Sequence, residues 1–232
     1  PRTHRIKVRR IGADDTAALD DIARLYETLP FHGIRNRSRL YDILTSWNYS
    51  VWYGTDDSGC VGYALAKDES VSELVLADEE RVPEFTVALF DAVGRGRLVV
   101  TLPAFLPGYA ERLCRICEEY TISPKKSFSV LNYERVVGAF ARLKAKTCRA
   151  TLPDGELTLL IHGRGGDENI TLTVNNGVPE AARTDKTHYA EYDHLEAMNL
   201  LFAPLCPQRD SLPDFARLWL PLPIYLFSAD AV

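Results

Sequence analysis

Hydrophobic and polar residues follow two periodicities along the first half of the chain. Apolar positions at helical spacing predict helices over residues 14–29, 35–47, 83–93 and 108–120. Strand-like stretches lie at residues 5–11, 49–53, 60–66 and 71–76, and the turn TDDSG joins the middle two into a hairpin. The apolar run at residues 98–102 predicts a central strand. This order of elements favours a mixed sheet packed against helices.

The second half of the chain has a separate set of elements. Helices are predicted over residues 133–145, 192–202 and 212–218. Strands are predicted around the polar loop HGRGGDEN, after the turn at residues 175–177, at residues 187–189 and next to Val130. We therefore expect an α+β protein with two domains, residues 1–128 and 129–232, whose boundary falls within residues 124–132.

The C-terminal residues combine large apolar side chains with prolines. Within residues 219–227, Pro221 and Pro223 exclude a regular helix, so we expect an extended path. An extended apolar segment is a liability in water, which predicts that it lies in a groove. The polar residues 228–232 would then emerge from this groove and carry the carboxylate of Val232 outward. Deletion of these five residues would leave the melting temperature almost unchanged.

Composition and charge exclude several classes of protein. Of the 232 residues, 46% are hydrophobic and 25% charged, which suits a chain with a sizeable core and argues against disorder. The net charge of −5 argues against a nucleic-acid partner, and no apolar run approaches the roughly 20 residues of a membrane span. Five scattered cysteines indicate reduced thiols in the cytoplasm. The chain begins with Pro1, so we expect a piece of a longer protein.

Two groups of residues have the composition of a metal or redox site, but their spacing favours structural roles. Cys114 and Cys117 form a CxxC without the second pair that a four-cysteine zinc site needs, and we expect both to face the core. The stretch HYAEYDH contributes His188, Glu191, Asp193 and His194 without a metal-binding helical spacing, which favours turn and capping roles for Asp193 and His194.

The remaining candidates show no catalytic pattern. Gly94 and Gly96 follow a predicted helix, and the glycines of residues 163–166 join two strands. A phosphate-binding loop must instead open a helix, so we interpret both groups as turn glycines. His162 lies at a hairpin end, where we expect it to be solvated.

The first half resembles the GNAT (GCN5-related N-acetyltransferase) fold. The likeness lies in the element order and in three stretches, at residues 6–27, 50–68 and 71–80. In an active GNAT domain the last of these strands leads into a Q/R-x-x-G-x-G/A loop, which binds the pyrophosphate of acetyl-CoA with backbone N–H groups. The matching stretch here, ERVPEFTVALF, has no glycine, and Pro83 removes a donor. The resemblance therefore implies that residues 1–128 form a GNAT-like domain without that loop, so that this chain alone binds no acetyl-CoA in the usual way.

The second half resembles a sterol-carrier-protein-like domain. Four stretches carry this likeness, at residues 127–140, 155–177, 194–204 and 220–232. A GNAT-like domain without the loop, followed by such a carrier-like domain, is similar to the C-terminal part of Eis-like (enhanced intracellular survival) acetyltransferases. Members of that subfamily use acetyl-CoA in an active GNAT domain that would precede Pro1.

The resemblance implies a role as the non-catalytic portion of an N-acetyltransferase. This portion would shape the pocket for a small amine acceptor and build a homo-oligomer interface. The terminal carboxylate, here that of Val232, is thought to act as a base in that subfamily, although the family pattern usually ends in an aromatic residue.

Two other functions remain open from the residues alone. The carrier-like half could bind a lipid in an apolar cavity, although core packing explains the same side chains, which are Phe202, Trp219, Leu222, Ile224, Tyr225 and Phe227. The chain could also be an interaction module whose proline-broken tail docks on a partner.

Overall fold

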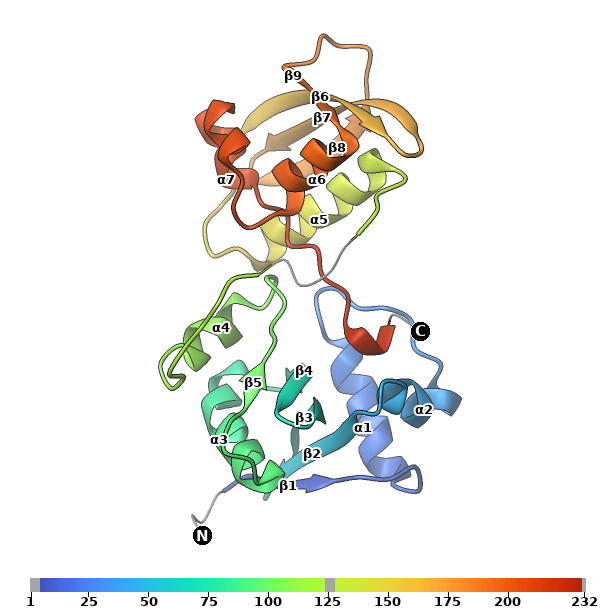
Figure 1. Cartoon of the computed structure of the whole chain (residues 1–232), viewed down its shortest axis with the longest axis vertical. Helices are drawn as coiled ribbons and strands as arrows, with labels where there is room; N and C mark the ends of the chain where they lie inside the picture. The colour runs from blue at the N-terminus through green and yellow to red at the C-terminus, as the bar shows by residue number, and fades with distance from the viewer. Residues whose placement is uncertain (1–4, 124–127, 231–232) are drawn as a thin grey trace. The chain divides into compact units, whose positions relative to one another are not determined.

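The computed structural model describes residues 5–123 and 128–230, which form two compact units (Figure 1). One unit contains the described residues up to Tyr120 together with the C-terminal segment from Leu226, and the other runs from Thr121 to Tyr225. Each unit has its own mixed sheet with helices, so the predicted α+β class is confirmed. Among the described residues, no helix combines the length and apolarity that crossing a membrane requires.

The first unit is built on a five-stranded sheet. Its order is β1 (Lys7–Arg10), β2 (Ser50–Asp56), β3 (Gly59–Lys67), β4 (Ser70–Leu76) and β5 (Val99–Val100). Strands β4 and β5 pair in parallel, and the other neighbours are antiparallel. The helices of this unit are α1 (Thr16–Glu27), α2 (Leu40–Thr45), α3 (Val82–Val93) and α4 (Pro107–Leu113), with short 3-10 helices at Arg37–Arg39, Glu79–Arg81 and Ser228–Asp230.

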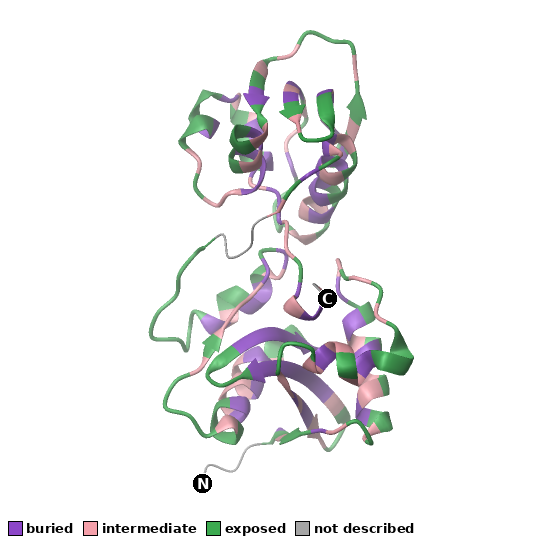
Figure 2. Ribbon diagram, turned by 45° about the vertical axis from the view of Figure 1, so that its right-hand side comes forward, coloured by how far each residue is buried: buried purple, intermediate pink, exposed green. Residues whose placement is uncertain are grey.

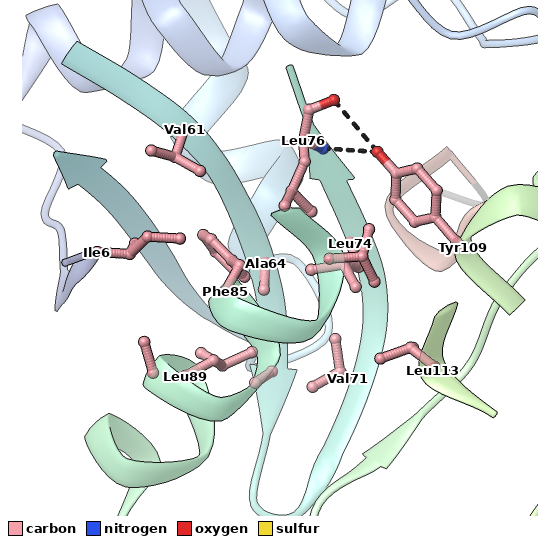
Figure 3. Packing of buried hydrophobic residues seen from close by; sticks show 13 residues of the cluster. Ile6, Val61, Ala64, Val71, Leu74, Leu76, Phe85, Leu89, Tyr109 and Leu113 are labelled. Atoms are coloured by element: carbon pink, nitrogen blue, oxygen red, sulfur yellow. Dashed lines mark hydrogen bonds between the residues drawn. The ribbon is translucent and has the colours of Figure 1, made fainter. Parts of the chain in front are cut away.

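The two faces of this sheet bury different kinds of side chain. On one face, Phe85 and Leu89 of α3 pack in a cluster with Ile6, Ala64 and Leu74 (Figure 3). Residues of β4 alternate between the faces, so Glu73 points away from this cluster and toward the face that α1 covers. Buried positions, coloured purple in Figure 2, follow the strands of this sheet.

The second unit has a four-stranded sheet in the order β8-β7-β6-β9. Its strands are β6 (Gly155–Gly163), β7 (Gly166–Asn175), β8 (Val178–Arg183) and β9 (Ala190–Asp193), and β9 runs parallel to β6. Helix α5 (Tyr133–Thr147) packs on β7 and β8. Helices α6 (His194–Phe202) and α7 (Asp214–Trp219) flank a 3-10 helix at Pro207–Ser211.

Three elements of the first unit are shorter than the pattern predicted. The run at residues 98–102 is not a central strand, because β5 has two residues and pairs with β4 alone. Leu98, Val100 and Leu102 pack against the core cluster instead, so their apolar character reflects packing in the core. Helix α4 ends at Leu113 rather than near residue 120. The predicted helix 35–47 begins at Leu40, because Arg35 turns into the interior and Asn36 caps a 3-10 helix.

Two boundaries in the second unit also differ from the prediction. The strand predicted at residues 187–189 lies at Ala190–Asp193, and the following helix starts at His194. The side chain of Asp193 accepts from the amide of Glu196 at 2.8 Å, and this cap ends the strand. The stretch of residues 128–132 forms no strand.

Candidate functional site

The carboxyl end of β4 is the place where this sheet could receive a ligand. Strands β4 and β5 pair only through Ser70 with Val99 and Val71 with Val100, so the later residues of β4 have no strand partner on that side. In open sheets with parallel strands, ligands usually bind in the crevice beyond the carboxyl ends of the strands. Leu76, the last residue of β4, therefore has backbone groups that need a partner from outside the sheet.

The side chain of Tyr109 from α4 occupies this position. Its hydroxyl accepts from the Leu76 amide at 2.9 Å and donates to the Leu76 carbonyl at 3.2 Å (Figure 3). Tyr109 is buried, and burial raises its pKa to about 12, so the phenol stays protonated and can donate at neutral pH. The last backbone groups of β4 are therefore satisfied within the protein.

The start of α3 presents negative charge where a phosphate would need free amides. Glu79 and Glu80 precede the helix, and the side chain of Asp78 already accepts from the Glu80 amide at 2.9 Å. Pro83 has no N–H to offer. Arg112 pairs with both Glu79 and Glu80, so its charge is directed to these carboxylates. An anion at this helix start would face carboxylates, which oppose the favourable helix dipole.

A buried ionic cluster lies on the other face of the same strand. Arg35 donates from its two terminal nitrogens to the two carboxylate oxygens of Glu73, at 2.8 Å each. Its Nε donates to Oδ1 of Asp230 at 2.7 Å. The exposed fractions of the three side chains are 5% for Arg35, 0% for Glu73 and 8% for Asp230. One guanidinium therefore neutralises a strand carboxylate and a carboxylate of the C-terminal segment together.

Two tyrosines complete this cluster, in which carboxylates outnumber cations. Tyr26 of α1 donates to Asp230 at 2.7 Å and stacks its ring 3.6 Å from the guanidinium of Arg35. Tyr63 of β3 donates to Glu73 at 2.5 Å. Burial raises the pKa of Tyr26 and of Tyr63. Burial also works against the charge of Arg35, but the bonds to Glu73 and Asp230 raise the pKa of this guanidinium overall. The tyrosines therefore act as neutral donors to the excess negative charge.

The C-terminal segment from Leu226 is thus held in the first unit and does not lead away from it. Phe227 and Ala229 are buried, Phe227 packs edge-on against Tyr26, and Trp47 donates from its indole nitrogen to the carbonyl of Ser228 at 3.0 Å. The prediction that residues 228–232 lead away from the protein is wrong for Ala229 and Asp230, because Ala229 is buried and the nearly buried carboxylate of Asp230 accepts from Nε of Arg35. Val232, the predicted catalytic residue, lies outside the described residues.

His188, Glu191, Asp193 and His194, which the sequence placed in one stretch, do not share a single ligand site in the second unit. Asp193 caps α6, which confirms its structural role, and Nδ1 of His194 bonds to the hydroxyl of Tyr133 at 2.8 Å. Glu191 bonds to Nε2 of His162 at 2.6 Å, and among the described residues no group of His, Cys, Asp and Glu is suited to hold a metal. His162 also bonds to Asp167 at 2.9 Å; the bonds to Glu191 and Asp167 raise the pKa of its imidazole.

The CxxC does not face the core. Because α4 ends at Leu113, Cys114 and Cys117 lie beyond the regular helix, and both are exposed free thiols. They also lie at the carboxyl end of the helix, where its dipole does not favour a thiolate. The structure therefore gives this motif neither a packing role nor a redox environment.

The second unit encloses a small apolar void between α5, β6, β7 and Trp219. Its volume is about 10 Å³, which is room for about one water molecule. A pocket for a lipid-sized ligand has a volume of roughly 300 Å³ or more. Phe227, which the sequence had placed among the cavity residues, packs in the first unit against Tyr26 and Phe105.

Comparisons with known proteins identify the fold. A comparison with protein-family models finds no match for the sequence, and neither does a comparison with curated proteins. Among solved structures, a GCN5-related N-acetyltransferase from Anabaena variabilis matches 98% of this chain at 12% identity with a TM-score of 0.54. The chain spans 62% of the length of that protein. The chain therefore has a GNAT-like fold.

Two further structures show weaker similarity. A GCN5-related N-acetyltransferase from Kribbella flavida matches 94% of this chain and 57% of its own, at 17% identity and a TM-score of 0.48. An aminoglycoside acetyltransferase from an uncultured soil metagenomic sample, solved with sisomicin, matches 54% of this chain and 97% of its own, at 17% identity and a TM-score of 0.38.

Sequence reasoning missed both sites in the first unit. A signal existed for Glu73, since a single carboxylate inside the apolar strand VSELVL needs a cation or a proton when it is buried. No local signal identified Arg35 or Asp230 as its partners, because they lie 38 and 157 residues from Glu73 along the chain. Tyr109 is one tyrosine among 11, and its spacing shows nothing unusual.

Substitution of Asp230 tests the anchoring of the C-terminal segment. Asp230→Ala should lower the free energy of unfolding by about 2 kcal/mol, because buried donors of Arg35 and Tyr26 lose a charged partner. Asp214→Ala is the matched control, since Asp214 is exposed, and it should cost less than about 1 kcal/mol. Urea denaturation measures both, and equal losses would contradict the anchoring role. Deletion of residues 228–232 should likewise lower the melting temperature, contrary to the expectation from the sequence, because it removes the bonds of Asp230 to Arg35 and Tyr26.

Removal of one hydroxyl tests the closure at the end of β4. Tyr109→Phe should destabilise the protein by about 1–3 kcal/mol, because the amide and carbonyl of Leu76 lose their partner inside the protein. Tyr120→Phe, at an exposed position, is the control and should be neutral. Thermal denaturation compares the two variants; a Tyr109→Phe protein as stable as the control would show that Leu76 does not depend on this bond.

Proposed function

We propose that this chain is the C-terminal, non-catalytic portion of an Eis-like, acetyl-CoA-dependent N-acetyltransferase. The first unit is a GNAT-like domain without a working cofactor site, and the second is a sterol-carrier-protein-like domain. An active GNAT domain upstream supplies acetyl-CoA and the chemistry. This chain shapes the pocket for a small amine acceptor and contributes to a homo-oligomer interface.

The observation that carries this proposal is the closed end of β4. The fold is that of acetyltransferases, yet the residues at the expected cofactor position do not fit acetyl-CoA. Tyr109 satisfies the backbone of Leu76, and Glu79 and Glu80 stand where the pyrophosphate would need amides. When the backbone of Leu76 and the start of α3 are used in internal contacts, a GNAT-like domain is suited to support the active upstream domain rather than to catalyse the reaction itself.

The anchored C-terminal segment supports the same proposal. Arg35 holds Asp230 in the first unit, which restricts the path of the chain two residues before Val232. A carboxylate can act as a base only when it is held within hydrogen-bond reach of the proton that it takes. In this proposal the Val232 carboxylate is delivered to the upstream active site, and the Arg35 cluster limits where it can go.

A lipid-carrier function is not favoured by the second unit. Its apolar void holds about one water molecule, and Trp219 and Leu220 contribute to its wall. Core packing explains these side chains without a ligand. Lipid found by native mass spectrometry on the purified protein would reverse this preference.

Titration of acetyl-CoA into the protein tests the proposal. We expect no binding tighter than about 1 mM by calorimetry, because the cofactor position offers carboxylates in place of amides. The reading frame upstream of Pro1 should encode a GNAT domain that contains the Q/R-x-x-G-x-G/A loop. A low-micromolar dissociation constant for this chain, or an upstream frame without that domain, would contradict the assignment.

A further inference from the structure

Two cations of the second unit are held by backbone carbonyls rather than by carboxylates. The guanidinium of Arg209 is buried and donates to the carbonyls of Leu200 at 2.8 Å and of Asn199 and Pro204 at 3.2 Å, with a further bond to Ala203. These carbonyls lie at the end of α6, where the helix dipole favours a cation. Burial nevertheless lowers the pKa of Arg209, so these carbonyls offset only part of the cost of burying its charge.

Lys144, in the last turn of α5, has fewer hydrogen-bond partners than Arg209. Its amine donates to the carbonyl of Pro221 at 3.2 Å, and none of the ion pairs among the described residues includes it. Burial lowers the pKa of Lys144 to about 8; Cys148 opposes this shift, and the charge of Arg209 adds a smaller effect in the same direction as burial. A large share of this amine is therefore neutral, and nucleophilic, at slightly alkaline pH.

An exposed thiol lies one helical turn away from this amine. Cys148 is the residue that ends α5, and its amide donates to the Lys144 carbonyl at 2.7 Å. Positions four residues apart are neighbours on one helix face, with Cβ atoms about 5–6 Å apart. The thiol is free and exposed, whereas the amine is partly buried. A bulky reagent can therefore reach the sulfur of Cys148 more easily than the nitrogen of Lys144.

We propose that Cys148 and Lys144 form a self-acylation site for small acyl thioesters such as acetyl-CoA. In the first step Cys148 loses its proton to solvent and its thiolate attacks the thioester carbonyl. A carbon–sulfur bond to Cys148 forms, the bond to the sulfur of coenzyme A breaks, and the departing thiolate takes a proton from solvent. In the second step the neutral amine of Lys144 attacks the Cys148 thioester. The carbon–sulfur bond breaks, the amine loses a proton to solvent, and the Cys148 thiol is restored. The net change is one acetamide on Lys144 and one free thiol of coenzyme A.

The local geometry favours transfer through sulfur over direct attack. Thiolates exchange readily with thioesters, and the second step is intramolecular, which gives it the advantage of proximity. The acetamide keeps one N–H that can donate to Pro221, while it removes a buried charge close to Arg209. This reaction needs no cofactor pocket, so it does not rest on the proposed function.

Incubation of the full chain with acetyl-CoA at pH 8 tests the site. Mass spectrometry of peptides should show Lys144 acetylated about tenfold faster than Lys146, an exposed lysine on the same helix, because the acetyl group on Cys148 is passed to the amine one helical turn away. S-acetylglutathione should give the same order, since the reaction depends on a thioester and not on coenzyme A.

Two substitutions separate the steps. Cys148→Ala should reduce acetylation of Lys144 at least tenfold, while Cys117→Ala, at another exposed free thiol, should leave it unchanged. Lys144→Arg should abolish the acetamide and leave a thioester detectable on Cys148. The proposal is overturned if Lys144 reacts no faster than Lys146, or if Cys148→Ala leaves the rate at Lys144 unchanged. Both alanine positions are exposed, so their folds should be retained, which circular dichroism checks.

Discussion

The buried carboxylate of Glu73 is the constraint around which the first unit is organised. Glu73 lies in the interior on β4, where an unpaired charge would cost several kcal/mol. Arg35 turns into the protein and neutralises the charge of Glu73. For this reason the helix predicted at residues 35–47 starts only at Leu40. The bidentate pair with Glu73 uses the two terminal nitrogens of Arg35, so its Nε can donate to Asp230. The position of the C-terminal segment thus follows from one charge in the middle of a strand.

The same strand takes part in two sets of internal contacts. Toward α1, β4 bears the ionic cluster, and at its carboxyl end Tyr109 bonds both backbone groups of Leu76. Two independent sets of contacts are therefore made by β4, the strand next to the expected cofactor position. A protein organised in this way retains the architecture of the fold while it closes the place where the cofactor would enter. The supporting role that we propose beside an active domain rests on this combination.

The sequence predicts the fold well wherever a local signal decides the structure. The hairpin of β2 and β3 and the glycine after α3 at Gly94 follow from residue types at fixed spacing, and both are present. The expected absence of a pyrophosphate loop rests on equally local evidence. The predictions fail where the interacting residues are distant in sequence. An apolar run, for example, does not show whether its residues pair in a sheet or only pack against the core, as at β5. The candidate site is missed because Arg35, Glu73 and Asp230 meet only in three dimensions.

Hydrogen exchange at the Leu76 amide tests the central claim most directly, which is that the end of β4 is closed by the protein itself. The account predicts that this amide exchanges only when the first unit unfolds, and that saturating acetyl-CoA leaves its exchange rate unchanged. Rapid exchange of the Leu76 amide in the free protein, or a marked slowing when acetyl-CoA is added, would contradict the account, because either result would mean that this amide is available to a ligand.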